Sequence, residues 1–342
     1  MVNRITGPCI VVAVLGTSLI AQDRQGGQGF SFRTSVALVS VNATVTDAGG
    51  YAVPGLRAED FIIDEDGERQ TITQFESERV PVSLGIVLDT SGSMAGEKMA
   101  AAQAALRRFV FDLLGPQDEM FLYRFDRHPV LVQGWTEDRR EVVRALGAVN
   151  ASGGTALYDA VADAIPLAAT GGRRKKAVVI ISDGNDTNSA IELGEVRQLI
   201  RESEVMVYAI GIDASVASVT GRSRGGPPAS PVPWPPGPIQ LPWPRRPSPP
   251  PQPPTSQRQG TNDRVNVQAL RMLTDESGGR TEIIGGARDL DAATAGIASE
   301  LSQQYFLGYV STRPKDGRWH AISVQVKRGN YHVRARRGFI AG

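Results

Sequence analysis

The chain has little of what several common protein classes require. Its single cysteine, Cys9, allows no disulfide within the chain. The three histidines, His128, His320 and His332, lie outside any catalytic motif, which argues against a histidine-based triad. With 37 basic and 36 acidic residues, the chain also lacks the positive surplus typical of nucleic-acid-binding proteins. What remains is a chain with 41% hydrophobic residues, enough to bury a sizeable core.

No apolar run in the sequence reaches the length of a membrane-spanning helix, and the longest run lies near the start of the chain. Arg4 precedes the run from Ile10 to Ile20, and Ala21 suits the last residue before a cleavage site. A span needs roughly 20 apolar residues, so we expect residues 1–21 to be a cleaved signal peptide rather than a retained anchor. The mature chain would then be extracytoplasmic, in the periplasm, on the cell surface or in the medium, and would begin with a flexible linker over 22–32.

Alternating apolar and polar residues predict β-strands at both ends of the chain. The sequence predicts strands at 36–46, 305–310, 320–326 and 331–335, and a hairpin formed by 61–70 and 72–75. Neither set is long enough to build a comfortable core alone. We therefore expect residues 33–80 and 305–342 to pair into one small β-domain.

Residues 81–304 alternate between strand and helix patterns, which favours an α/β fold with a doubly wound, mostly parallel sheet. The expected strands are 82–88, 119–125, 130–133, 177–182, 205–211 and 280–284. The expected helices are 96–114, 137–149, 156–169, 189–203, 264–277 and 288–303. A turn at 127–129 makes the strand at 130–133 an antiparallel edge strand.

A long insert at 214–263 interrupts this alternation. Pro227 to Pro254 holds fifteen of the chain's 22 prolines, a composition that prevents a packed element and predicts disorder or polyproline II. Trp234 and Trp243 each stand between two prolines. The insert either presents these aromatic residues to a partner or serves as an inert spacer.

The most informative motif follows the apolar strand at 82–88. Asp89, Ser91 and Ser93 place a carboxylate and two hydroxyls at alternate positions, and Gly92 allows the loop to bend tightly. Ligands of open α/β sheets lie beyond the carboxyl ends of such strands. Oxygen ligands of this kind suit hard cations such as Mg²⁺, so the motif indicates a metal site.

Other interpretations of this motif each lack a part. An aspartyl-phosphate enzyme would carry a second acid at the position of Ser91, and an aspartic protease would need a second copy of Asp89-Thr90-Ser91. A subtilisin-like nucleophile at Ser93 would need a histidine base. The remaining alternative is a polar turn in which Ser91 or Ser93 caps the helix that begins near Gly96.

Two further segments fit the same site. Thr155 ends a glycine-rich loop before the helix at 156–169, where its alternative role is an ordinary helix N-cap. Asp183 follows the buried strand at 177–182, where its alternative is a solvated loop acid. In order, the three segments read Asp-x-Ser-x-Ser, then Thr, then Asp, each beside the end of a strand or the start of a helix.

This pattern resembles the von Willebrand factor type A domain and its metal-ion-dependent adhesion site. The resemblance covers nearly all of residues 35–340, including the flanking strands, and is to a bacterial branch of secreted proteins. It implies that the cation is held directly by three hydroxyls, with two aspartates acting largely through water. The five residues are Ser91, Ser93 and Thr155 as direct ligands and Asp89 and Asp183 behind them.

The resemblance implies an exported, non-enzymatic module that binds a partner protein through the cation. A shell of mostly neutral ligands leaves one position for an exposed Asp or Glu of that partner. Mg²⁺ is the expected cofactor, with Mn²⁺ and Ca²⁺ as alternatives. The alternatives are a structural subunit of a cell-envelope assembly with a stabilising metal and, less favoured, a metal-dependent hydrolase, for which the sequence offers no base beyond Asp89 and Asp183.

Overall fold

The computed structural model describes residues 37–213 and 265–341. The expected signal peptide, the linker and the proline-rich insert lie outside the described residues. These three predictions therefore stay predictions.

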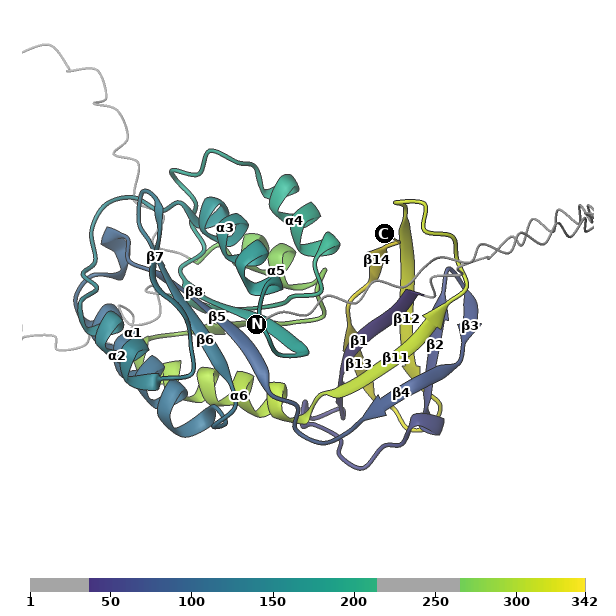
Figure 1. Ribbon diagram of the computed structural model, residues 1–342. Coiled ribbons are helices and arrows are strands. Elements are labelled where there is room, and N and C mark those ends of the chain that lie inside the picture. The colour runs from purple at the N-terminus through teal and green to yellow at the C-terminus, as the bar shows by residue number, and fades with distance from the viewer. Residues whose placement is uncertain (1–36, 214–264, 342) are drawn as a thin grey trace, which may run out of the picture. The chain divides into compact units, whose positions relative to one another are not determined.

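A six-stranded sheet forms the centre of the α/β part, in the order β10-β9-β8-β5-β6-β7 (Figure 1). All neighbours are parallel except β6 and β7, which are antiparallel. The inner strands β5, β8 and β9 are buried almost throughout, as expected for near-continuous apolar runs with helices on both faces. The predicted α/β class, with one antiparallel edge strand, is confirmed. The strands are β5 Val82–Asp89, β6 Glu119–Phe125, β7 Pro129–Thr136, β8 Lys175–Ser182, β9 Met206–Ile212 and β10 Thr281–Ile284.

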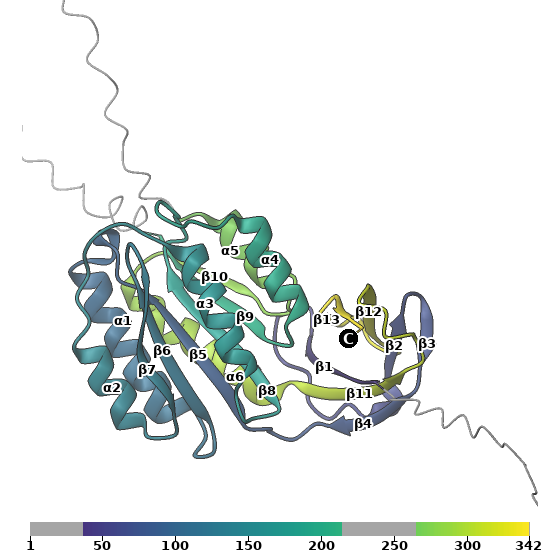
Figure 2. The ribbon, with the colours of Figure 1, turned by 45° about the horizontal axis from the view of Figure 1, so that its top comes forward.

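Helices cover both faces of this sheet (Figure 2). One hydrophobic core lies between the sheet and α1, α2 and α6, and a second lies between the sheet and α3, α4 and α5. The helices are α1 Glu97–Arg108, α2 Arg139–Gly147, α3 Leu157–Ala169, α4 Leu193–Glu202, α5 Val267–Thr274 and α6 Leu290–Gln303. Short 3-10 turns lie at Ala58–Asp60, Gly92–Met94 and Ala287–Asp289.

Several boundaries differ from the sequence-based ones for physical reasons. The helix expected over 96–114 ends at Arg108 and continues as a π-helical turn, Phe109–Leu113, which places Phe109 and Val110 in the core. The helix expected from 189 begins at Leu193, because residues 183–192 form a loop that caps another helix. A short strand, β14, was not expected as a separate element.

Strands from the two ends of the described chain pair with one another. β1 lies between β11 and β13, and β12 lies between β2 and β14. The two sheets, in the orders β13-β1-β11-β4 and β14-β12-β2-β3, enclose a third hydrophobic core. The two end segments therefore pair, as expected. The expected hairpin of 61–70 with 72–75 is wrong, because β2 pairs with β3 inside 61–70 and β4 pairs with β11. The strands are β1 Ala37–Thr46, β2 Phe61–Glu65, β3 Glu68–Gln70, β4 Ile72–Glu76, β11 Tyr305–Ser311, β12 Trp319–Val326, β13 His332–Ala335 and β14 Gly338–Ile340.

A buried carboxylate on α6 joins the helix to strands of both sheet systems. Glu300 Oε1 accepts hydrogen bonds from Thr44 Oγ1 of β1 (3.1 Å) and from the Tyr208 hydroxyl of β9 (2.9 Å). Its Oε2 accepts from an Arg334 guanidinium nitrogen of β13 (2.6 Å) and lies 3.1 Å from Arg280 Nε. Because Glu300 is only 7% exposed, these partners replace the water that a carboxylate would otherwise bind.

We expect Glu300→Gln to destabilise the protein by about 2–3 kcal/mol, because it removes the charge that two partly exposed arginines neutralise. Denaturant unfolding of the full chain measures the change. The matched control is Glu195→Gln on the exposed surface of α4, which should stay within about 0.5 kcal/mol of the wild type. Equal stability of the two variants would show that the Glu300 network is not a significant source of stability.

Candidate metal centre

Backbone hydrogen bonds bring two of the three predicted segments together. The loop after β5 and the loop before α3 are joined by Ser152 N, which donates to Thr90 O (2.7 Å), and by Gly92 N, which donates to Gly153 O (3.0 Å). At the next position, a Cβ on Gly154 would lie 1.9 Å from Asn188 Oδ1, so a larger residue there would have to displace that side chain. Ser91, Ser93 and Thr155 therefore lie on two loops that contact each other.

The third segment joins through the neighbouring strand. β5 and β8 are adjacent and parallel, so Asp89 and Ser182 end their strands at the same edge of the sheet. Ser182 Oγ donates to Asp89 Oδ2 (2.6 Å), and the negative charge of Asp183 acts on the Asp89 carboxyl. All three predicted segments thus converge at the carboxyl edge of the sheet.

The hydroxyls of Ser91 and Ser93 form a hydrogen bond to each other, with 3.0 Å between their Oγ atoms. In an octahedral shell with oxygen ligands at about 2.0–2.1 Å from Mg²⁺, neighbouring ligands lie about 2.9 Å apart. The two oxygens therefore have the separation of two adjacent ligands of one cation. Ser91 is buried, whereas Ser93 is exposed, so the pair lies where solvent reaches the loop.

The helix-capping interpretation of the serines is wrong. Helix α1 begins at Glu97, and its N-cap is Gly96, which has a φ of +74° and provides no side-chain cap. Ser91 precedes the 3-10 turn Gly92–Met94, also without a side-chain capping bond. Neither serine hydroxyl is committed to a helix terminus.

The N-cap interpretation of Thr155 is also wrong. The N-cap of α3 is Ala156, and side chains from the loop after β8 satisfy the first amides of the helix. Asp186 Oδ1 accepts from Leu157 N (2.8 Å), and Ser189 Oγ accepts from the next two amides (3.0 and 3.1 Å). This distant cap leaves the buried Thr155 hydroxyl without a capping role.

Asp89 is fully buried, and among the described residues no Lys, Arg or His forms an ion pair with it. Burial raises the pKa of Asp89 to about 6, and the charge of Asp183 adds to this rise. Hydrogen bonds from Ser182, from the Ser91 hydroxyl and from Ser91 N (2.8 Å) lower it in part. A cation at this edge would supply the missing positive charge, so the donor set of two carboxylates and three hydroxyls fits a hard divalent ion.

Sequence reasoning missed three residues that shape the site. Ser182 was treated only as part of a strand, although its position beside Asp183 at a strand end gave a signal. Asp186 and Ser189 carried no usable signal, because they cap a helix that starts about thirty residues earlier in the chain. Within 37–213 and 265–341, no group of three or more His, Cys, Asp or Glu side chains suited to a metal occurs.

Comparison with known families gives a match over part of the chain. Residues 84–185 match the von Willebrand factor type A domain. The matched stretch begins within β5 and ends just after β8, so it contains Asp89, Ser91, Ser93, Thr155 and Asp183.

Curated relatives share this region at low identity. The inter-alpha-trypsin inhibitor heavy chain H4 of Bos taurus is 25% identical over 155 residues, and that of Homo sapiens is equally similar. The mouse heavy chain 4 is 26% identical over 164 residues. Each match covers 40–42% of this chain but only 17% of the relative, so the chain spans about a sixth of the length of these proteins. Assignment to a bacterial branch stays a prediction.

Solved structures resemble the chain in part. The von Willebrand factor type A protein of Catenulispora acidiphila has 13% identity and a TM-score of 0.48, covering 90% of this chain and 73% of its own. The type A domain of the type V pili tip protein Mfa5 of Porphyromonas gingivalis has 26% identity and a TM-score of 0.30, covering 32% and 40%. No helix in the described part of the chain is both long and apolar enough to cross a bilayer.

We expect Asp89→Asn to raise the free energy of unfolding of the metal-free protein at pH 7.5. The difference between variant and wild type should be up to about 3 kcal/mol more favourable to the variant at pH 7.5 than at pH 3.5. The wild-type carboxyl holds its proton up to about pH 6 when folded but only to about pH 4 when unfolded. Wild-type stability is therefore lost as the pH rises through this window, whereas Asn has no proton to lose. Denaturant unfolding of metal-stripped protein at both pH values measures the difference.

The control for that measurement is Asp112→Asn, at an exposed position on the π-helical turn. It should show no comparable change between the two pH values. A stability difference between Asp89→Asn and the wild type that stays constant across this pH range would contradict the raised pKa of the buried Asp89 carboxyl.

Proposed function

We propose that this chain binds a partner protein through a divalent cation held at the carboxyl edge of the β5–β8 sheet. The observation that carries the proposal is the 3.0 Å separation of the Ser91 and Ser93 hydroxyls beside the buried Asp89, which forms no ion pair with a Lys, Arg or His among the described residues. Neither hydroxyl caps a helix; the two hydrogen-bond to each other, and the Ser91 hydroxyl also donates to Asp89, which holds both oxygens at the site. Mg²⁺ is the proposed ion, with Mn²⁺ and Ca²⁺ as alternatives.

The role proposed for each of the five residues follows from its exposure and charge. Ser91, Ser93 and Thr155 would contact the cation directly, while Asp89 and Asp183 would act mainly through water. Neutral hydroxyls leave most of the cation's charge uncompensated, and three of them fill half of an octahedral shell. An exposed Asp or Glu of a partner can complete such a shell at the solvent-facing side, near Ser93.

Binding rather than hydrolysis is the function that this donor set favours. Hydrolysis would need a base free to take a proton from water. Both oxygens of Asp89 already accept hydrogen bonds, from Ser91 N and from Ser182 Oγ. We therefore propose a non-enzymatic interaction module, exported as the character of residues 1–21 predicts.

We expect saturable binding of Mg²⁺ or Mn²⁺ to the metal-stripped full chain, measured by isothermal titration calorimetry. The double variant Asp89→Ala, Ser91→Ala should lose this binding, because it removes one ligand and the carboxylate behind the site. The matched control, Asp112→Ala with Ser77→Ala, changes the same residue types at exposed positions away from the site and should bind like the wild type.

The outcome also separates the proposal from its main alternative. A purely structural metal would raise the unfolding temperature without any metal-dependent affinity for carboxylate ligands. Wild-type protein that fails to bind either ion would contradict the proposed function.

A further inference from the structure

The turn between β6 and β7 lies directly beside the proposed cation site. Phe125 O accepts from both the amide (2.7 Å) and the hydroxyl (2.9 Å) of Thr90. The next carbonyl, Asp126 O, accepts from Ala156 N (2.7 Å) at the start of α3. The turn is therefore fixed to both loops that carry the hydroxyl ligands.

Arg127 extends from this turn over the glycine-rich loop. A Cβ placed on Gly153 would lie 3.4 Å from Arg127 Cγ and 3.6 Å from its Nε. Gly153 is itself hydrogen-bonded to Gly92, which lies between Ser91 and Ser93. With consecutive Cα atoms 3.8 Å apart, the guanidinium group lies on the order of 10 Å from the serine hydroxyls.

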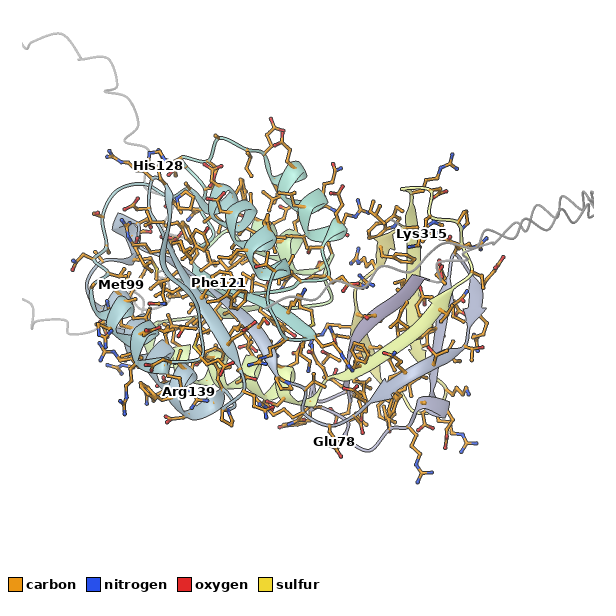
Figure 3. All side chains as sticks on the ribbon, in the orientation of Figure 1. Glu78, Met99, Phe121, His128, Arg139 and Lys315 are labelled. Atoms are coloured by element: carbon orange, nitrogen blue, oxygen red, sulfur yellow. The ribbon has the colours of Figure 1, made fainter. Side chains whose placement is uncertain are left out.

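The charge of Arg127 is not neutralised within the described part of the protein. Its neighbour Arg124 pairs with Asp126 (2.9 Å), whereas Arg127 has no acidic partner among residues 37–213 and 265–341. Arg127 and His128 are both exposed, and Figure 3 shows His128 at the outer tip of the β6–β7 hairpin. The positively charged Arg127 side chain thus lies beside a site proposed to receive a carboxylate.

We propose that Arg127 is a second anchor for the partner, so that the preferred ligand is a segment with two carboxylates rather than one. This inference rests on the proposed function: the first carboxylate completes the cation's shell, and the second pairs with the Arg127 guanidinium. Guanidinium forks match carboxylates in a bidentate manner, which fixes orientation as well as charge. In an extended segment, side chains two residues apart lie on one face, about 7 Å from each other. Two acidic side chains at this spacing can reach both the cation and the Arg127 guanidinium.

The test uses two fluorescein-labelled peptides of glycine and serine, one with a single Asp and the other with Asp followed two positions later by Glu. Binding to the full chain is followed by fluorescence anisotropy in Mg²⁺ at low salt, because exposed charge pairs are screened at high salt. Wild-type protein should bind the two-acid peptide about fivefold more tightly than the one-acid peptide.

Arg127→Gln should abolish this preference while its affinity for the one-acid peptide stays unchanged. Arg57→Gln, at an exposed arginine before the 3-10 turn Ala58–Asp60, is the matched control and should keep the preference. An unchanged preference in Arg127→Gln, or equal wild-type affinities for the two peptides, would overturn the second anchor alone.

Failure of the underlying function gives a different result. If neither peptide binds in a metal-dependent manner, the acidic-partner function and the second anchor both fall. Metal-dependent binding of the one-acid peptide without any preference for two acids leaves the function intact and removes only the role of Arg127.

Discussion

The constraint on which the centre depends is a carboxylate that is buried without a positively charged side chain beside it. Asp89 ends a strand that is buried along its whole length, so the fold removes its side chain from water and offers hydroxyls and an amide in exchange. These partners orient the carboxylate but leave its charge uncompensated. The fold thus places an unfavourable buried charge at one point of the sheet edge, where a nearby positive charge would stabilise it. Such local instability is common at functional sites.

Much of the fold could be predicted because its signals are local. Uninterrupted apolar runs ending in Asp89 and Ser182 identify buried parallel strands, and alternation at 37–46 identifies a half-buried one. The convergence of the three site segments followed from the rule that ligands gather at the carboxyl ends of parallel strands.

What escaped prediction depends on contacts between residues distant in sequence. The cap of α3 comes from Asp186 and Ser189, so the local pattern at Thr155 suggested a cap that the fold does not use. Glu300 reads as an ordinary helix-surface acid until its partners on β1, β9 and β13 are known. The π-helical turn after Arg108 likewise follows from core packing rather than from helix propensity.

The pairing of β1 with β11 has a consequence for how the chain folds during synthesis. The register joins Ala37 to Ser311, so β1 has no partner on this side until almost the whole chain has been made. The α/β part, whose strands pair with partners nearer in sequence, can complete its core earlier. Until then the backbone groups of β1 are unpaired and its apolar inward face is uncovered. Because such a strand can pair with other chains, β1 is the segment most prone to aggregation during this interval. A chaperone that shields residues 37–46 during this interval would protect the chain from such pairing.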